Sequence, residues 1–229
     1  MCGITAYCGN GEALPFLMQG LAKLEYRGYD SAGVTVLNNT LTTVKCKGRL
    51  KNLEEKLKNH DMTGHIGIGH TRWATHGEPS DINSHPHGNK RVSIVHNGII
   101  ENYKDIKNFL IDKGYTFISE TDTETVAKLL DYYYEGDPVD AIIKTLKDVR
   151  GAYALGIVFK DFPDRIFAVR KDSPLIIGAG DEENFIASDV PAILKYTRNV
   201  YYIGNLEMAC VRKGEITFYN LDGEEIQKE

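Results

Sequence analysis

The chain has 229 residues, of which 42% are apolar and 26% are charged, as in an ordinary globular protein that folds in water. Its formal net charge of -5 argues against a nucleic acid or an anionic membrane surface as partner. Because no apolar run approaches the roughly 20 residues of a membrane-spanning helix, and because no secretion signal opens the sequence, we expect a cytoplasmic protein.

The first part of the chain alternates strands with helices. An apolar run before a Gly-Asn-Gly turn predicts a buried strand, and leucines spaced by three and four residues then predict a helix. Two β-prone runs around Asn-Asn-Thr predict a hairpin, and a second leucine repeat predicts a short helix. In chain order, these elements are expected at 3–8, 14–24, 34–37 with 41–46, and 50–57.

A long polar loop and a later change of pattern organise the rest of the chain. Strands are predicted at HIGIGHTRW and RVSIVHNG, and the loop 77–90 between them is long enough to suggest a function. From Gly151 onward, successive apolar runs predict strands. A first part that contains both strands and helices, followed by a run of strands, favours an α+β fold with antiparallel sheets and outer helices. The three helices that precede Gly151 are expected near 102–113, 123–134 and 138–147.

Five short segments carry polar residues of the kinds that catalysis uses. They are Cys2-Gly3, LEYRGYDSAG (24–33), HTRWATHGEPS (70–80), HNGIIEN (96–102) and SETDTE (119–124). Taken singly, each also has a simpler structural interpretation. These are a harmless terminal cysteine at Cys2, a surface arginine at Arg72, a core aromatic at Trp73, a turn at Asn97-Gly98, and a helix cap at Thr121 with Asp122 as a first-turn acid.

Taken together, the segments meet the requirements of a thiol nucleophile acting on an amide. Removal of Met1 would give Cys2 a free α-amine with a pKa of roughly 7.7–8.0, which can accept the thiol proton. The Asn97 side chain and the Gly98 backbone N–H are suitable donors for an oxyanion. A free amino acid also presents a carboxylate and an ammonium, for which Arg72 and Asp122 have the right charges.

These segments resemble the class II glutamine amidotransferases, and among them the glutaminase domain of the glutamine–fructose-6-phosphate aminotransferases. The resemblance runs in order through essentially the whole chain, and LEYRGYDSAG with HTRWATHG is its most discriminating part. Phosphoribosyl-pyrophosphate amidotransferases and asparagine synthetases share the terminal cysteine but differ in these two segments. The resemblance implies a four-layer αββα sandwich of the N-terminal-nucleophile hydrolase type, with L-glutamine as substrate and with neither cofactor nor metal.

The resemblance also implies roles for individual residues. Cys2 would form a glutamyl thioester, with Asn97 and Gly98 as the oxyanion hole. Arg27 would lie near the nucleophile in a structural or a catalytic role, while the histidines at 85 and 87 receive no chemistry. The residues expected to bind substrate or close over it are Arg72, Trp73, Thr75, His76, Gly98 and Asp122.

The chain departs from the resembling family in two ways. Ala6 and Cys8 stand in the predicted first strand where many relatives have a glycine and an aliphatic residue. We expect residues 2–220 to form the glutaminase domain and 221–229 to begin an interdomain linker. The second departure is the absence of the sugar-phosphate isomerase domain. That domain would receive the ammonia, and the full-length enzyme would be a homodimer. The chain is therefore either an excised domain or a separate subunit.

Three other functions remain open from the sequence. All seven histidines lie between residues 60 and 96, which permits a metal-binding protein, although no zinc-type spacing is present. A non-catalytic regulatory module could keep the same fold, and the same glutaminase could serve a different ammonia acceptor.

The four cysteines show no C-x-x-C pair and are expected to be reduced thiols.

Overall fold

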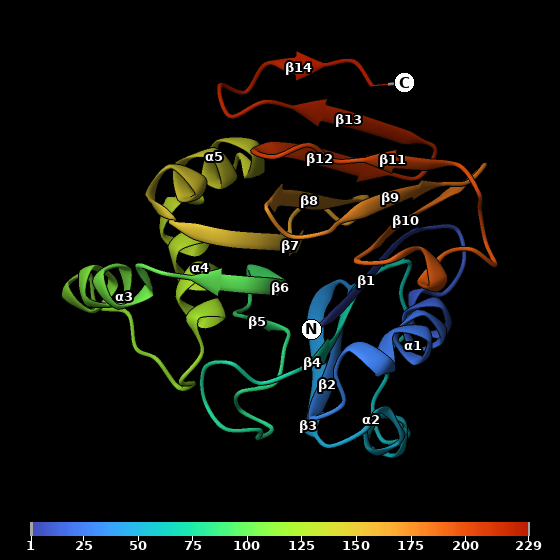
Figure 1. Cartoon of the computed structure of the whole chain (residues 1–229), viewed down its shortest axis with the longest axis horizontal. Coiled ribbons are helices and arrows are strands. Elements are labelled where there is room, and N and C mark those ends of the chain that lie inside the picture. The colour runs from blue at the N-terminus through green and yellow to red at the C-terminus, as the bar shows by residue number, and fades with distance from the viewer. Residues whose placement is uncertain (1, 229) are drawn as a thin grey trace.

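Two antiparallel seven-stranded sheets form the centre of the computed structural model, which describes residues 2–228 (Figure 1). The first sheet runs in the order β11 (Val200–Tyr202), β9 (Ile176–Ala179), β10 (Glu183–Ala187), β1 (Gly3–Gly9), β4 (Ile66–Arg72), β2 (Ser31–Asn38) and β3 (Thr40–Lys47). The second runs in the order β14 (Glu225–Ile226), β13 (Glu215–Tyr219), β12 (Glu207–Arg212), β8 (Arg165–Lys171), β7 (Gly151–Phe159), β6 (Val92–Ile100) and β5 (His87–Gly88).

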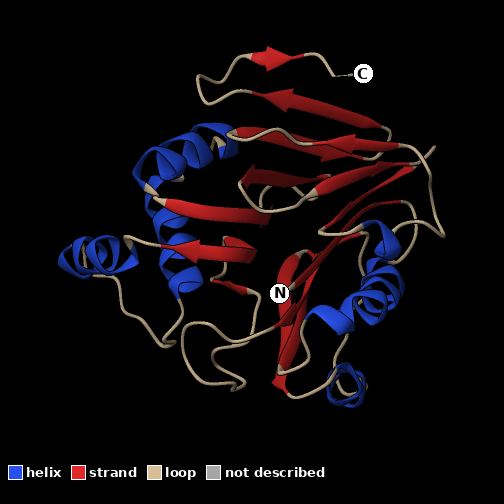
Figure 2. Cartoon of the chain, viewed as in Figure 1, coloured by secondary structure: helices blue, strands red, loops and turns tan. Residues whose placement is uncertain are grey.

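Helices cover the outer face of each sheet, as Figure 2 shows. The first sheet carries α1 (Ala13–Leu24) and α2 (Leu50–Leu57), together with the short 3-10 helices Glu25–Arg27 and Val190–Ala192. The second sheet carries α3 (Tyr103–Asp112), α4 (Asp122–Tyr133) and α5 (Pro138–Asp148). The predicted α+β class and the four-layer αββα sandwich are therefore confirmed.

Alternation along β1 explains how one strand serves two hydrophobic cores. Ile4, Ala6 and Cys8 belong to the core between the sheets, whereas Tyr7 packs with the leucines of α1 on the outer side. The departures at Ala6 and Cys8 thus lie in the first strand, as predicted, and both side chains are buried against the second sheet.

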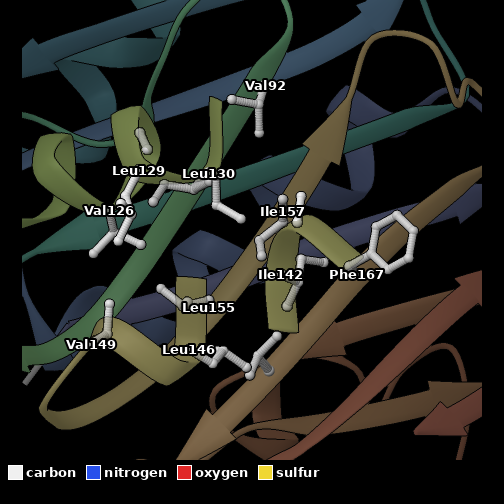
Figure 3. Close-up of a cluster of buried hydrophobic side chains, with 14 of the residues drawn as sticks. Val92, Val126, Leu129, Leu130, Ile142, Leu146, Val149, Leu155, Ile157 and Phe167 are labelled. Carbon is white, nitrogen blue, oxygen red and sulfur yellow. The ribbon is translucent and has the colours of Figure 1, made fainter. Parts of the chain in front are cut away.

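A third core lies between the second sheet and its helices. Figure 3 shows Val126, Leu129 and Leu130 of α4 pointing toward the strand residues Leu155 and Ile157. All five side chains are almost fully buried. Burial of a leucine or valine side chain stabilises a fold by roughly 1.5–3 kcal/mol, so this core fixes α4, whose first residue lines the site described below.

Most elements follow their predicted positions, with differences at the ends. The predicted helix 123–134 begins at Asp122, and the predicted hairpin is the pair β2 and β3. The short strand β14 lies inside the predicted linker and pairs with β13, so the second sheet continues beyond residue 220. The division of the chain at that residue stays a prediction.

One half-buried lysine holds the long loop 77–90 against the first sheet. Nζ of Lys45, on β3, lies 3.2, 2.7 and 3.0 Å from the carbonyl oxygens of Ile82, Ser84 and Pro86. On the neighbouring strand, a Cβ at Gly33 would lie only 2.1 Å from the carbonyl oxygen of His85, so this position requires glycine. The loop is therefore packed closely onto the sheet.

Replacing Lys45 with methionine is expected to destabilise the fold. Lys45→Met keeps the apolar stem but leaves three loop carbonyls without their charged donor, which should lower the free energy of unfolding by about 2 kcal/mol or more. Lys47→Met on the same strand is the matched control, because the Lys47 side chain is exposed. Urea denaturation compares the two variants; equal stabilities would show that the contacts of Lys45 contribute nothing.

No helix formed by residues 2–228 is both long enough and apolar enough to cross a membrane.

Candidate active site

A cavity of about 290 Å³ opens where β1 begins, β4 ends and α4 begins. It collects side chains from both sheets and from the segments that follow β4 and β8. All the predicted site residues line it: Cys2, Arg27, Arg72, Trp73, Thr75, His76, Asn97, Gly98 and Asp122. Residues far apart in the sequence thus meet in one place. The simpler structural interpretation of each segment does not explain why they meet.

Cys2 is held by contacts from three separate parts of the chain. Its Sγ accepts a hydrogen bond from the backbone N–H of Trp73 at 3.2 Å, and its carbonyl oxygen accepts from Arg27 Nε at 3.2 Å and Asn97 Nδ2 at 3.0 Å. Burial, more than any other cause, raises the pKa of the Cys2 thiol. The thiol is therefore protonated near neutrality, and it needs a base before it can act as a nucleophile.

Asn97 and Gly98 lie inside a strand. Both belong to β6 and pair with Ala154 and Tyr153 of β7, so the interpretation of this pair as a turn is wrong. Gly98 has a φ of +123°, and a Cβ there would lie 2.1 Å from the carbonyl oxygen of Ala152. Only glycine fits, because both the backbone conformation and the close approach exclude a side chain.

Arg72 is buried, so its interpretation as a surface arginine is also wrong. Its side chain lies at the end of β4, and Nη2 donates to the carbonyl oxygens of His76 and Gly77. Its Nη1 is buried without a hydrogen-bond partner among residues 2–228. A buried guanidinium nitrogen without a partner is costly, and an anionic ligand in the cavity would satisfy it.

Asp122 combines its helix-cap position with a place in the cavity. Thr121 Oγ1 accepts the N–H of Glu124, which confirms the predicted cap. Asp122 is the first residue of α4, and its Oδ2 accepts the backbone N–H of Ile100 at 2.9 Å. The carboxylate is therefore fixed in the cavity wall, and its predicted role in binding the substrate stays a prediction that the helix cap does not exclude.

The segment after β4 lies at the mouth of the cavity. Trp73 is half exposed, so its interpretation as a core aromatic is wrong; its ring packs edge-on against Tyr29 with 5.7 Å between centroids. His76 packs in the same manner against Tyr103 at 5.3 Å. Asp30 accepts the backbone N–H of Ala74, which ties the middle of the segment to the first sheet.

Arg27 connects the nucleophile to a neighbouring turn. Besides its contact with the Cys2 carbonyl, its Nη1 donates to Asp189 Oδ2 at 2.8 Å. Tyr26 OH donates to the same carboxylate oxygen at 2.7 Å. Arg27 thus links the backbone of Cys2 to Asp189, the residue before the short helix Val190–Ala192.

Several residues that line the cavity were not predicted from the sequence. His85 belongs to the loop that we expected to be functional because of its length. No local signal marks Ser173 and Pro174, which reach the cavity from the segment after β8. The additional residues that line the cavity are His85, His96, Ile99, Thr121, Thr123, Ser173 and Pro174.

Three of the histidines pack together as buried rings. His70 stacks on His85 with 4.1 Å between centroids, and His87 packs edge-on against His85 at 5.0 Å. Burial lowers the pKa of each of these three rings. Within residues 2–228, no three His, Cys, Asp or Glu side chains are placed to hold a metal ion. The metal-binding interpretation is therefore not favoured.

Comparisons with known proteins agree with this geometry. The family described as "Glutamine amidotransferase domain" matches residues 70–195. All of the chain aligns, at 58% identity, with the glutamine–fructose-6-phosphate aminotransferase (isomerizing) of Clostridium acetobutylicum, and at 57% with that of Caldanaerobacter subterraneus subsp. tengcongensis. The chain spans 38% of the length of each of these relatives.

Solved structures support the same fold. The glutamine phosphoribosylpyrophosphate amidotransferase from B. subtilis matches 96% of this chain and 49% of its own, with a TM-score of 0.82 at 25% identity. A structure described as the allosteric regulatory enzyme of purine biosynthesis matches the same shares with a TM-score of 0.84, also at 25% identity. The predicted N-terminal-nucleophile hydrolase type of fold is confirmed by this likeness.

Proposed function

The chain belongs to the glutamine amidotransferase domain family, and from this premise we propose that it hydrolyses L-glutamine to glutamate and ammonia through a thioester on Cys2. One observation carries the proposal: the cavity that contains the Cys2 thiol also contains Arg72 and Asp122, the two opposite charges that a free amino acid requires. The carboxylate of glutamine would bind the open Nη1 of Arg72, and its ammonium would bind Asp122 and the Gly98 carbonyl. Its amide would then face Cys2.

The proposed reaction uses the α-amine that removal of Met1 would expose. Cys2 Sγ bonds to the amide carbon, the carbonyl π electrons move to the oxygen, and the thiol proton passes to the α-amine. Asn97 Nδ2 and the Gly98 N–H would stabilise the oxyanion. The α-ammonium then protonates the leaving nitrogen, ammonia departs, and water hydrolyses the thioester by the same steps to give glutamate and the free thiol.

The segment after β4 would close the site during this reaction. Thr75 and His76 stand at the mouth of the cavity, where they can cover bound glutamine. The half-exposed Trp73 can gate the exit of ammonia. Arg27 would act as a structural support of Cys2, through its contact with the Cys2 carbonyl oxygen.

We further propose that the ammonia serves the amination of fructose 6-phosphate to glucosamine 6-phosphate. The names of the relatives and the 38% of their length that the chain spans support this acceptor. The isomerase that uses the ammonia would be a further domain or a separate subunit, within a cytoplasmic homodimer in the full-length enzyme. In this scheme residues 2–220 form the glutaminase domain, and 221–229 lead toward the acceptor part.

The isolated chain is expected to release glutamate from glutamine unaided. All the groups proposed for thioester chemistry lie between Cys2 and Asp122, so fructose 6-phosphate should leave the rate unchanged, and no glucosamine 6-phosphate should form. Paired assays with and without the sugar phosphate, together with calorimetry, measure this. Absence of glutamate release from protein whose intact mass shows loss of Met1 would overturn the glutaminase proposal. Saturable binding of the sugar phosphate would instead show that the acceptor site is misplaced.

A further inference from the structure

A buried histidine on the first sheet contacts the proposed oxyanion hole on the second. His70 lies on β4 and is fully buried. Its Nε2 lies 3.0 Å from the carbonyl oxygen of His96 and 3.0 Å from Oδ1 of Asn97. The proposed chemistry does not use this ring, although it is the direct neighbour of the Asn97 amide.

We propose that His70 is a positioning residue that fixes the orientation of the Asn97 amide, so that its NH₂ group faces the reacting oxygen. The inference deepens the proposed glutaminase function and rests on it. His70 does not touch glutamine in this scheme; it acts through Asn97.

The proton on His70 is determined by its two neighbours. A carbonyl oxygen only accepts hydrogen bonds, so the contact with His96 requires a proton on Nε2. Burial lowers the pKa of His70 to about 3, so the ring is neutral near pH 7 and carries a single proton. Its Nδ1 is then an acceptor, and it is buried without a hydrogen-bond partner among residues 2–228. The ring therefore presents a permanent donor, Nε2–H, to Asn97.

This donor selects one of the two orientations of the Asn97 amide. The atom that faces Nε2–H must be the oxygen Oδ1, which turns Nδ2 toward Cys2. One hydrogen of Nδ2 is donated to the Cys2 carbonyl oxygen at 3.0 Å, and the second remains for the oxyanion. In the opposite orientation, Oδ1 would face the developing negative charge and would repel it.

The surroundings of His70 keep its ring in place. His85 stacks on it with an interplanar angle of 13°. His85 belongs to the loop that Lys45 holds, and its carbonyl oxygen fits closely against Gly33. The ring of His70 is therefore fixed by the packing of the loop 77–90, and the amide of Asn97 is fixed by the ring.

Substitutions at His70 test whether the donor or merely the shape matters. The side-chain nitrogen of glutamine can occupy the place of Nε2, whereas that of asparagine reaches only the place of Nδ1. We expect His70→Gln to retain most of the activity. His70→Met and His70→Asn should lower kcat about tenfold, a fraction of the loss caused by removing an oxyanion donor. KM for glutamine should change less than about twofold, since Arg72 and Asp122 are untouched.

A second readout separates positioning from general damage. Glutamate γ-semialdehyde forms a hemithioacetal with Cys2, and the oxygen of this adduct occupies the oxyanion hole. Its inhibition should weaken about tenfold in His70→Met and His70→Asn, whereas inhibition by glutamate should stay unchanged. His65→Met is the matched control, because His65 is an exposed histidine just before β4 whose Nδ1 contacts the Gly11 carbonyl.

The outcomes distinguish this inference from the function on which it rests. A parent chain that lacks Met1 yet releases no glutamate overturns the proposed function, and the inference with it. An active parent whose His70→Asn variant matches His70→Gln overturns the inference alone. A loss that falls on KM, or on glutamate and semialdehyde inhibition equally, overturns it as well. If His70→Met does not fold, the comparison of the glutamine and asparagine variants still decides.

Discussion

Replacing Cys2 with alanine is expected to reduce glutamine hydrolysis by at least about a thousandfold, to the background of the assay. The thiol is the nucleophile that attacks glutamine in the proposed reaction, and no other cysteine lines the cavity formed by the described residues. Thermal unfolding should be unchanged, because the side chain contributes only weak contacts of its sulfur with the Trp73 backbone. Cys46→Ala on β3 is the control and should retain the parent rate.

Covalent labelling identifies the nucleophile independently of the rate. A glutamine analogue that carries an electrophilic diazoketone should add once per chain, on Cys2, and should not label the alanine variant. The other cysteines, Cys8, Cys46 and Cys210, are buried, so they should stay unmodified. An adduct on any of these three would contradict the assignment. The intact mass of the same sample shows whether Met1 has been removed.

Changing either charge that is proposed to bind glutamine is expected to lower kcat/KM about ten- to a hundredfold. The loss of a hydrogen bond to a charged group corresponds to roughly 1.5–3 kcal/mol. Asp122→Asn keeps the shape but removes the charge that would balance the ammonium. Arg72→Lys replaces the planar guanidinium group with an ammonium group, which is a point charge and cannot bind a carboxylate bidentately. Steady-state kinetics with glutamine measures both variants.

Matched substitutions outside the cavity control for the loss of charge and the change of side chain. Asp140→Asn removes a half-exposed first-turn carboxylate of α5 that pairs with Lys144, and Arg91→Lys changes an arginine that pairs with Asp131. Both controls should hydrolyse glutamine at the parent rate. If Asp122→Asn and Arg72→Lys did so too, their carboxylate and guanidinium would have structural roles only.

Local sequence patterns predicted the elements well but misplaced individual site residues. The leucine spacing of α1 and the cap at Thr121 are properties of a few consecutive residues, which the sequence displays directly. The burial of Arg72 depends instead on strands that are distant in the sequence. When these strands pack around it, its charged side chain becomes buried. In the same way, Asn97-Gly98 has turn chemistry, but the pairing of β6 with β7 places it in a strand.

Contacts between the two sheets could not be predicted from any single segment. His70 and Asn97 lie on different sheets, and only the packing of one sheet on the other brings Nε2 and Oδ1 to 3.0 Å. Ser173 and Pro174 reach the cavity through the order of strands in the sheet. The resemblance to a known family anticipated which residues meet, because it carries tertiary information that local propensity lacks.

The position of β1 inside the first sheet affects when a newly made chain can become active. The strand pairs with β4 on one side and with β10 (Glu183–Ala187) on the other. The first residues synthesised can therefore complete their strand pairing only after a segment made much later has left the ribosome. A ribosome-bound chain that ends before residue 183 lacks that partner and leaves β1 with an open edge. Ammonia release should therefore begin only late in translation, and activity on stalled ribosomes would report the completion of the sheet.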